Sequence, residues 1–437
     1  MKNNFIKKVI TIALATSMFA VSLCGCQKEV KENRVKHTDN LLAGVQKSET
    51  SPNYNFEDAV KKPENYESYI SDSCTLGLNM LKTKDYDSFN TITAPLSVTV
   101  SLSALANGTA KDTLKELKST LGKSSYTNDV FNQCGAYITQ KLSFFNNENT
   151  GVYDISSVWV KDEYSPKRSF LQKYENFYKD VFVYKADFAS SNINQVINNF
   201  GFDNTKEIIT SKCINTSADY QLYLDTAVAV SDVWLTDYEK DKVKQGDFTT
   251  AMGEAVKVNY LTSVERSFSN KDVTGFVKDL KNVPCKMVFI MPNEDVTLEK
   301  YVAELKAENF LALLQDMKPT DFVNASVPEF TISESTSIKD CLQEIGVKEI
   351  FLKSADFSKG FAESVYVNDF TQSVSISLTE KGVSSTVETD KEETQKSTQQ
   401  ANVDLKLNRP FVYAVVDNES YAPIIMGTVT NPTEITN

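Results

Sequence analysis

A long polar tract near the C-terminus constrains the fold more than any other feature of this chain. Residues 379–402 contain no aromatic residue, leucine or isoleucine, whereas residues 365–378 before them and 403–407 after them have strand-like composition. A compact domain seldom tolerates a structureless connection of this length, so the tract is either functional or a disordered insertion. Composition alone favours disorder.

Alternation within the first half of the tract points the other way. Val383, Ser385, Val387 and Thr389 share one face of an extended chain, and polar residues occupy the other face. This half is therefore suited to join a β-sheet with its small residues inward. Short polar tracts also alternate by chance, so the pattern by itself does not decide between a strand and disorder.

The rest of the chain mixes strand and helix signals. Apolar, β-branched runs predict strands at residues 155–160, 222–234, 286–291, 327–332, 365–378, 403–407, 411–416 and 424–429. Helical stretches separate them without a regular βαβ period. The expected class is therefore α+β with large antiparallel or mixed sheets.

One helix start is marked by capping chemistry. Thr109 and Asp112 have the spacing of a capping box, in which two side chains satisfy free backbone amides. Leu114, Leu117 and Leu121 then share one face, and the next residue is a glycine that favours a helix end. We expect a short amphipathic helix with these leucines in the core.

The histidine count excludes several kinds of catalysis. The chain has a single histidine, His37, in a polar stretch before the folded body. Ser-His-Asp and Cys-His catalysis, histidine zinc sites and histidine pH switches all need an imidazole. Nucleotide-binding and nucleophile-elbow motifs are also absent from the sequence. Paired-carboxylate catalysis stays open, but no spacing among the 58 acidic residues singles out a pair. We expect no enzyme activity, no cofactor and no metal.

The net charge limits the partners. A formal charge of -12 argues against nucleic acid, whose phosphates need a basic face, and against a polybasic membrane patch. With 41% hydrophobic residues, the chain has ample material for a core.

The N-terminus has the composition of an export signal. Lys2, Lys7 and Lys8 precede an apolar run, and the run ends in Leu23-Cys24-Gly25-Cys26. That tetrapeptide resembles a bacterial lipobox, which implies cleavage before Cys26 and attachment of a diacylglycerol to it. The alternative is ordinary signal cleavage with release.

These features give a domain organisation and a location. We expect a signal peptide at residues 1–25, a polar spacer at 26–61 and one folded domain at 62–437. The protein would be held by lipid on the extracellular face of the cell membrane, or alternatively be secreted.

The cysteines do not form a recognisable framework. Beyond the export signal the chain has Cys74, Cys134, Cys213, Cys285 and Cys341, which are widely spaced and odd in number. Neither a disulfide framework nor a CxxC metal site is indicated, so we expect buried free thiols.

Several segments together resemble a known family. Residues 405–415 (LKLNRPFVYAV) and 426–432 (MGTVTNP) resemble the serpin segments that follow the reactive loop. Residues 90–121, 327–330 and 337–351 are similar to earlier serpin landmarks in the same order, and Glu380-Lys381-Gly382 is similar to the serpin loop hinge. The resemblance covers nearly the whole body.

This resemblance implies a fold and a mechanism. The fold would be the α+β serpin fold, with large mixed β-sheets, about eight or nine helices and an exposed reactive loop at about residues 380–404. A target protease would cut the loop and be trapped covalently as the cut loop inserts into the central sheet. The hinge residues would be Glu380, Gly382, Val383, Ser385, Val387 and Thr389. We expect a monomer whose partner is a protease.

The position of the reactive bond depends on how it is counted. Inhibitory serpins have it about fourteen residues beyond the hinge glycine, which gives Lys396-Ser397 and a trypsin-like serine protease as target; a cysteine protease is also possible. Counting back from Pro410 gives Gln399-Gln400 instead. We prefer the first count, because insertion depth is measured from the hinge.

Departures from the family pattern keep a second function open. Lys391 and Glu393 fall on the inward face of the inserting segment, where burying a charge costs several kcal/mol. Gln372 stands where serpins usually have a histidine, and Ala94 where a serine is common. The alternative is therefore a non-inhibitory serpin that acts as a cell-surface binding or scaffold protein. A solute-binding lipoprotein is a third class, which the ordered motifs disfavour.

Overall fold

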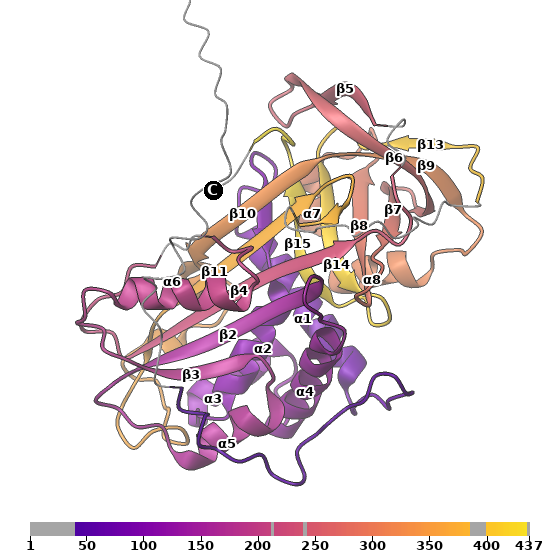
Figure 1. The fold of residues 1–437 in the computed structure, drawn as a ribbon. Helices are drawn as coiled ribbons and strands as arrows, with labels where there is room; N and C mark the ends of the chain where they lie inside the picture. Colours follow the sequence, from indigo (N-terminus) through magenta and orange to yellow (C-terminus); the bar gives the residue numbers. More distant parts are fainter. Residues whose placement is uncertain (1–39, 211–213, 239–242, 385–398, 435–437) are drawn as a thin grey trace, which may run out of the picture. The chain divides into compact units, whose positions relative to one another are not determined.

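The computed structural model describes residues 40–210, 214–238, 243–384 and 399–434, which form two large sheets and nine α-helices (Figure 1). The helices are α1 (Tyr66–Lys82), α2 (Pro95–Ala106), α3 (Lys111–Leu121), α4 (Asn128–Phe144), α5 (Arg168–Phe177), α6 (Ile193–Asn204), α7 (Leu298–Glu304), α8 (Ala307–Gln315) and α9 (Lys339–Glu344). This is the mixed α+β class that the sequence predicts.

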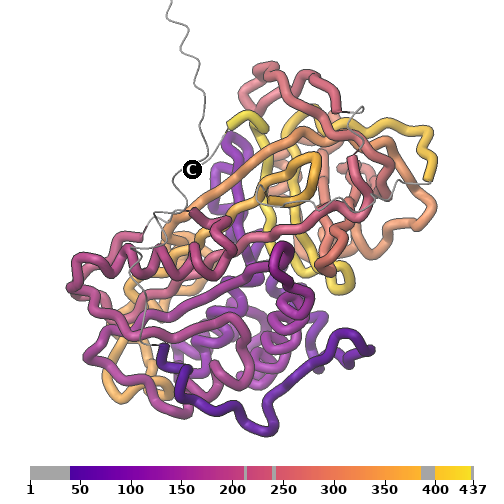
Figure 2. The backbone as a smooth tube through the Cα atoms, in the orientation of Figure 1, coloured from indigo at the N-terminus to yellow at the C-terminus, as the bar shows by residue number. Residues whose placement is uncertain are grey.

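The larger sheet has nine strands. Its order is β1-β15-β14-β8-β7-β6-β9-β13, and β5 pairs with β6 off this path. The bounds are β1 (Thr91–Thr93), β5 (Lys244–Thr249), β6 (Ala255–Ser269), β7 (Val273–Asp279), β8 (Cys285–Pro292), β9 (Phe322–Pro328), β13 (Asp404–Lys406), β14 (Phe411–Asp417) and β15 (Pro423–Val429). Figure 2 shows the C-terminal strands beside the N-terminal helices, and β1 pairs directly with β15.

The smaller sheet has six strands in the order β10-β11-β12-β4-β2-β3, with an additional pairing between β11 and β4. The bounds are β2 (Gly151–Lys161), β3 (Val181–Ala186), β4 (Leu222–Val233), β10 (Phe330–Ser337), β11 (Val367–Leu378) and β12 (Gly382–Val383). Strand β4 is parallel to β11 and antiparallel to β2. Two strands that are far apart in the sequence therefore lie side by side in the β4–β11 pair.

The two faces of the six-stranded sheet pack against different helices. On the inner face, Ser101 of α2 donates to Ser156 of β2 at 2.8 Å. On the outer face, Phe200 of α6 packs edge-on against Trp159 of β2 with ring centroids 5.9 Å apart. Figure 1 shows α6 lying across this sheet. Even-numbered residues of β4 thus point to the inner core, and odd-numbered ones toward α6.

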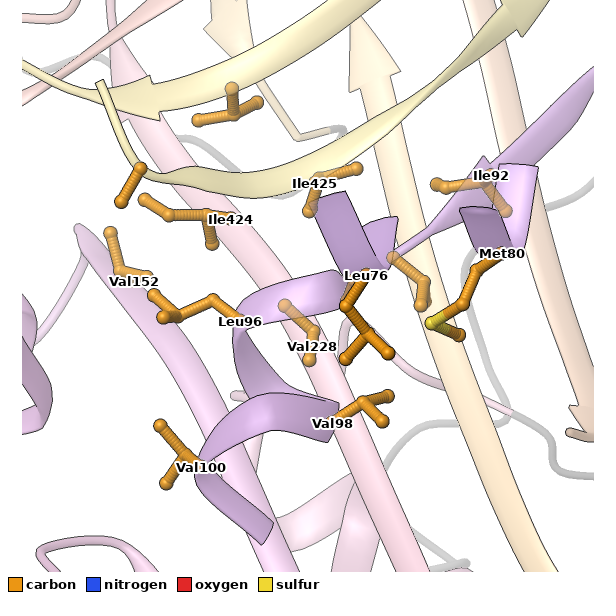
Figure 3. Packing of buried hydrophobic residues seen from close by; sticks show 14 of the residues in the cluster. Leu76, Met80, Ile92, Leu96, Val98, Val100, Val152, Val228, Ile424 and Ile425 are labelled. Carbon is orange, nitrogen blue, oxygen red and sulfur yellow. The ribbon is translucent and has the colours of Figure 1, made fainter. Parts of the chain in front are cut away.

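The main core lies between α1, α2, β15 and the sheets (Figure 3). Leu76, Leu96 and Val228 are each at most 2% exposed. Burial of such side chains stabilises the fold by roughly 1.5–3 kcal/mol each. Gly77 permits the close approach of the two helices, since a Cβ there would lie 2.5 Å from the Cβ of Pro95.

Two local predictions are wrong. Residues 327–332 form parts of two strands, because the chain leaves β9 at Pro328 and begins β10 at Phe330 in the other sheet. Helix α3 begins after Ala110, and no side chain caps it. Instead of capping the helix, Thr109 donates to the carbonyl oxygen of Ala106.

The segment expected to be a polar spacer contributes to the fold from residue 40 on. Leu42 is 7% exposed and lies in the main core. Tyr54 and Phe56 each pack against Tyr137 of α4 with ring centroids 5.3 Å apart. The sequence prediction missed these three residues because the segment around them is mostly polar. Contacts with the domain therefore begin about twenty residues before the expected boundary at residue 62.

No helix among the residues described is both long enough and apolar enough to cross a membrane.

Candidate functional site

The loop hinge already lies within the six-stranded sheet. After β11 the chain turns back, and Gly382 and Val383 form the short strand β12 between β11 and β4. Val383 pairs with Leu378 of β11 on one side and with Asp232 of β4 on the other. Its side chain is fully buried in the main core. The first residues of the loop therefore occupy the position of an inserted strand.

A tight turn connects β11 to β12. The amide of Thr379 donates to the carbonyl oxygen of Gly382 at 3.0 Å, and the Thr379 hydroxyl donates to the same oxygen at 3.1 Å. A Cβ at Gly382 would lie 2.1 Å from the carbonyl oxygen of Asp232, so only glycine fits here. Glu380 and Lys381 are at the turn, where Lys381 is exposed. The expected hinge motif thus makes the turn that β12 requires.

A buried tryptophan closes the end of the sheet beside this turn. Trp234, 1% exposed, donates its indole N–H to the carbonyl oxygen of Thr379 at 2.9 Å. The ammonium group of Lys278 lies 5.4 Å from the centre of that ring and 2.5 Å from a carboxylate oxygen of Glu265. Burial raises the pKa of Glu265, and the Lys278 charge opposes that shift.

Asp232 fixes the end of β4. One of its carboxylate oxygens accepts from the backbone amides of Asn282 and Val283 at 2.7 and 2.9 Å. The other accepts from the side-chain amide of Asn282 at 2.7 Å. Burial raises the pKa of Asp232, and these hydrogen bonds oppose the shift. The end of β4 that pairs with Val383 is therefore held in place by a carboxylate whose two oxygens both accept hydrogen bonds.

Midway along the pair of strands β4 and β11, which we call the seam, the two strands differ in their side-chain hydrogen bonds. Gln372 of β11 accepts from the Thr93 hydroxyl at 3.1 Å and the Ala94 amide at 3.0 Å, and it donates to the Ala94 carbonyl oxygen at 3.0 Å. Thr226 of β4 lies opposite Gln372, and its buried hydroxyl has no hydrogen-bond partner in the described part of the chain. Gln372 therefore ties β11 to the start of α2.

Side chains also link β11 to β10, its neighbour on the side away from β4. Three pairs of facing hydroxyl groups lie within hydrogen-bond distance: Thr331 with Ser377 at 2.8 Å, Ser333 with Ser375 at 2.7 Å, and Ser335 with Ser373 at 2.8 Å. On β4, the residues level with Ser373 and Ser375 are alanines. Side-chain hydrogen bonds thus link β10 to β11. The hydrogen bonds described for Gln372 and for these serines are all made to elements other than β4.

Several of the predicted site residues lie outside the described residues. They are the loop residues Ser385, Val387, Thr389, Lys396 and Ser397, and the lipidation candidate Cys26 near the N-terminus. The alternative bond, Gln399-Gln400, lies in an exposed segment just before β13. Asn324 holds the chain that follows, since its side-chain amide donates to the Ala401 carbonyl oxygen at 3.3 Å.

The remaining chemistry is sparse. Cys74, Cys134 and Cys285 are buried free thiols and Cys341 is partly buried, whereas Cys213 falls outside the described residues. Among the residues described, no cluster of three or more histidine, cysteine or acidic side chains has the geometry of a metal site. The most distinctive feature of the described site is therefore the short strand β12 between β11 and β4.

Sequence reasoning missed the polar groups around Trp234 and Asp232. Trp234 is one of only two tryptophans, and it ends a predicted strand, so its position was a usable signal. The partners of Asp232, Asn282 and Val283, are distant in sequence and carry no motif. Their role depends on the turn after β7 reaching β4.

Comparison with known proteins agrees with this geometry. The family model described as "Serpin (serine protease inhibitor)" matches residues 71–432. Among curated proteins, the chain is 22% identical to an uncharacterised serpin-like protein of Methanosarcina acetivorans, with 79% of this chain and 82% of that protein covered. It is also 23% identical to intracellular coagulation inhibitor 2 of Tachypleus tridentatus, with 85% of this chain and 92% of that protein covered.

A solved serpin shares more of the structure. The native state of the thermophilic serpin tengpin superposes with a TM-score of 0.79 at 28% identity, covering 91% of this chain and 100% of that one. Its latent state gives a lower TM-score, 0.71, and covers 85% of this chain. The α+β serpin fold predicted from the sequence is thus confirmed, and the chain belongs to the serpin family.

Proposed function

We propose that this serpin inhibits a serine-type endopeptidase as a suicide substrate. The serine oxygen of the protease attacks the carbonyl carbon of the reactive bond, the C–N bond breaks, and the amine leaves with a proton. The new N-terminus stays on the segment that leads into β13, which is paired with β9, and an ester joins the other side of the cut loop to the protease. Insertion of the loop between β4 and β11 then carries the protease away and prevents hydrolysis of the ester.

The single observation that carries this proposal is the position of β12. Val383 already pairs with both β4 and β11, and Gly382 pairs with β4, so the first step of insertion needs no new register. The TM-score is higher against native tengpin than against its latent state, which supports a described sheet that can still accept a strand.

Continuing the register of β12 tests whether more of the loop fits. Ser385 would lie opposite Val230, Val387 opposite Val228, and Thr389 opposite Thr226. The register with β11 independently places Thr389 opposite Gln372. The Thr389 hydroxyl would then meet the buried Thr226 hydroxyl, which lacks a partner within the described residues. Insertion to this depth would satisfy a group that otherwise costs about 1–3 kcal/mol.

For the reactive bond we propose Lys396-Ser397, which makes the target a trypsin-like serine protease, with a cysteine protease as the alternative. A protease binds several residues on both sides of the bond that it cuts, in an extended form. Gln399-Gln400 lies within two residues of Ala401, which Asn324 holds. Lys396 is farther from this fixed point.

We also propose the cellular setting from the sequence. Signal cleavage and acylation at Cys26 would hold the protein on the extracellular face of the membrane as a monomer. Because residue 40 already pairs with β3, the tether would be residues 27–39. Metabolic labelling with a fatty acid, compared between the natural chain and Cys26→Ser, tests this. Equal labelling of the two chains would contradict it.

The inhibition proposal is tested by incubating the full chain with trypsin and following products on denaturing gels. We expect a covalent complex that survives SDS, together with a released C-terminal fragment. Mass spectrometry of that fragment distinguishes a new N-terminus at Ser397 from one at Gln400. Simple cleavage without any complex, across a panel of serine and cysteine proteases, would contradict inhibition.

A non-inhibitory scaffold is the second candidate, and one observation favours it. The same register places Lys391 between Leu224 and Phe370, both at most 1% exposed. Burying an ammonium group between two apolar side chains is costly unless it finds a partner, and Glu393 follows on the same face. Loop cleavage that leaves the melting temperature unchanged would support this candidate.

A further inference from the structure

A buried lysine lies behind the tryptophan that contacts the loop hinge. Lys278 of β7 is fully buried although its side chain is charged. The chain just after β4 runs beside the end of β7, because Trp234 bridges to Leu280 and the amide of Leu235 donates to the carbonyl oxygen of Asp279 at 3.0 Å. Lys278 therefore lies where β7 meets the end of β4.

The ammonium group of Lys278 has a complete set of acceptors. It donates to the Thr236 carbonyl oxygen at 2.8 Å, to the Ser263 hydroxyl at 3.2 Å and to a carboxylate oxygen of Glu265 at 2.5 Å. An ammonium group has three donors, so all of them are used. Ser263 also donates to the same carboxylate oxygen, at 2.6 Å. Strand β6 and the segment after β4 thus fix the position of this charge from two sides.

Two aromatic rings complete the surroundings of the charge. The nitrogen atom of Lys278 lies 4.2 Å from the centre of the Tyr238 ring and 5.4 Å from that of the Trp234 ring. The two rings meet edge to face, with centroids 5.7 Å apart. A cation that is shielded from water is attracted to the face of an aromatic ring. The charge therefore favours one orientation of the indole ring.

The edge of the same indole ring reaches the loop hinge. Its N–H donates to the carbonyl oxygen of Thr379 at 2.9 Å. Thr379 in turn donates to the carbonyl oxygen of Gly382 through both its amide and its hydroxyl group. Turning the indole ring would break the hydrogen bond to Thr379. A continuous set of contacts therefore leads from Lys278 through Trp234 to the turn before β12.

Stability alone is a weak explanation for a charge at this position. Moving an ammonium group and a carboxyl group out of water has a penalty that their mutual attraction offsets only in part. Burial accordingly raises the pKa of Glu265, even with the Lys278 charge beside it. Apolar side chains of similar volume would fill the same space without that penalty.

We propose that Lys278 is a positioning residue for the inhibitory reaction, and that it acts through Trp234 to hold the hinge turn at Thr379. This inference rests on the proposed function. Insertion starts from the pairs that Val383 makes with β11 and β4, so it is fast only while the turn keeps β12 in that register. Without the charge, the indole ring reorients and β12 leaves the sheet more often. Hydrolysis of the acyl-enzyme then competes better with insertion.

The test uses a double variant that removes both charges and keeps the volume of the side chains. Lys278→Met together with Glu265→Gln leaves no unpaired buried charge in this cluster, so the domain should fold. Hydrogen exchange in the hinge peptide, residues 377–384, reports on the turn directly, because the amides of Thr379 and Ser384 are bonded within it. We expect this peptide to exchange about fivefold faster in the double variant than in the natural chain.

Two single variants are matched controls. Glu265→Gln alone keeps the ammonium group against Trp234, since the amide oxygen of glutamine still accepts from it. Lys141→Met removes another buried lysine, whose ammonium group pairs with Asp417 and Glu419 at 2.9 Å each. Both controls should lose stability in chemical denaturation, because each leaves a buried charge without its partner. Neither should change exchange in the hinge peptide.

The same four proteins are then incubated with trypsin, and the ratio of covalent complex to cleaved product is measured. In the double variant we expect this ratio to fall about fivefold, because slower insertion leaves more time for hydrolysis. Both controls should keep the ratio of the natural chain. A purely structural role for Lys278 would lower stability without changing this ratio.

The outcomes separate this inference from the proposed function. Hinge exchange in the double variant that matches the natural chain would overturn the positioning role, whether or not the protein inhibits. Exchange that is equally fast in the two controls would also overturn it, since the cause would then be a general loss of stability. A natural chain that traps no protease would overturn inhibition, and hinge exchange would still decide whether Lys278 holds the turn.

Discussion

The indole N–H of Trp234 donates to the carbonyl oxygen of Thr379 at 2.9 Å, and so links the end of β4 to the turn that starts the loop. Trp234 therefore holds the turn that precedes β12.

Replacing Trp234 with phenylalanine keeps an aromatic ring and removes this hydrogen bond. We expect the intact protein to lose about 1–2 kcal/mol of stability, because the Thr379 carbonyl oxygen and the shape of the pocket are both affected. Chemical denaturation of intact protein measures this. Leu235→Ala, at an exposed neighbouring residue, is the control and should have little effect. A Trp234→Phe protein of unchanged stability would contradict a holding role.

Gln372 offers a second test at the middle of the seam. Gln372→Leu would leave the Thr93 hydroxyl and the Ala94 amide buried without their acceptor, at a cost of about 1–3 kcal/mol. We expect a lower melting temperature for intact protein and faster spontaneous loss of inhibitory activity on warming. Gln245→Leu at an exposed position should change neither. If Gln372→Leu is as stable as the natural chain, the tie between β11 and α2 is unimportant.

Asp154 of β2 should contribute to the pH dependence of the intact protein's stability at moderate acidity. Loss of hydration raises the pKa of Asp154 to about 6, with a hydrogen bond from Ser97 opposing the shift and Asp180 adding to it. The folded-state pKa lies above the unfolded value, so the ionised form is disfavoured in the fold. Stability is therefore highest below about pH 4 for this group and is lost as the pH rises toward 6.

Asp154→Asn should remove that loss. The variant should be more stable than the natural chain above pH 7, by on the order of 2 kcal/mol, and equally stable near pH 4. Urea unfolding at several pH values measures the difference. Glu57→Gln, at an exposed position, should follow the natural chain throughout. A constant offset between the Asp154→Asn protein and the natural chain at all pH values would show that Asp154 does not titrate in this range.

The fold was largely predictable because its signals are local or belong to a family pattern. Strands such as β4 and β14 follow from apolar, β-branched runs, and the order of motifs identified the family. The break between β9 and β10 was missed because only Glu329 separates Pro328, the last residue of β9, from Phe330, the first residue of β10. Likewise, Tyr54 and Phe56 sit in a polar stretch whose partner on α4 is distant in sequence.

The candidate site was predictable only in part. The hinge motif and the alternation of Val383 with later residues are visible in the sequence, but partial insertion as β12 depends on pairing with two distant strands.

The hinge provides the sharpest test of function, since Val383 is fully buried between β11 and β4. Val383→Arg would force a guanidinium group into the main core, so β12 should leave the sheet and insertion after cleavage should slow. Hydrolysis of the acyl-enzyme should then be faster than loop insertion. Trypsin should therefore convert the variant to cleaved product with little covalent complex. Lys381→Arg, at the exposed turn beside it, should form complex like the natural chain. If Val383→Arg traps trypsin as efficiently as Lys381→Arg, insertion at this hinge is not what stops the protease.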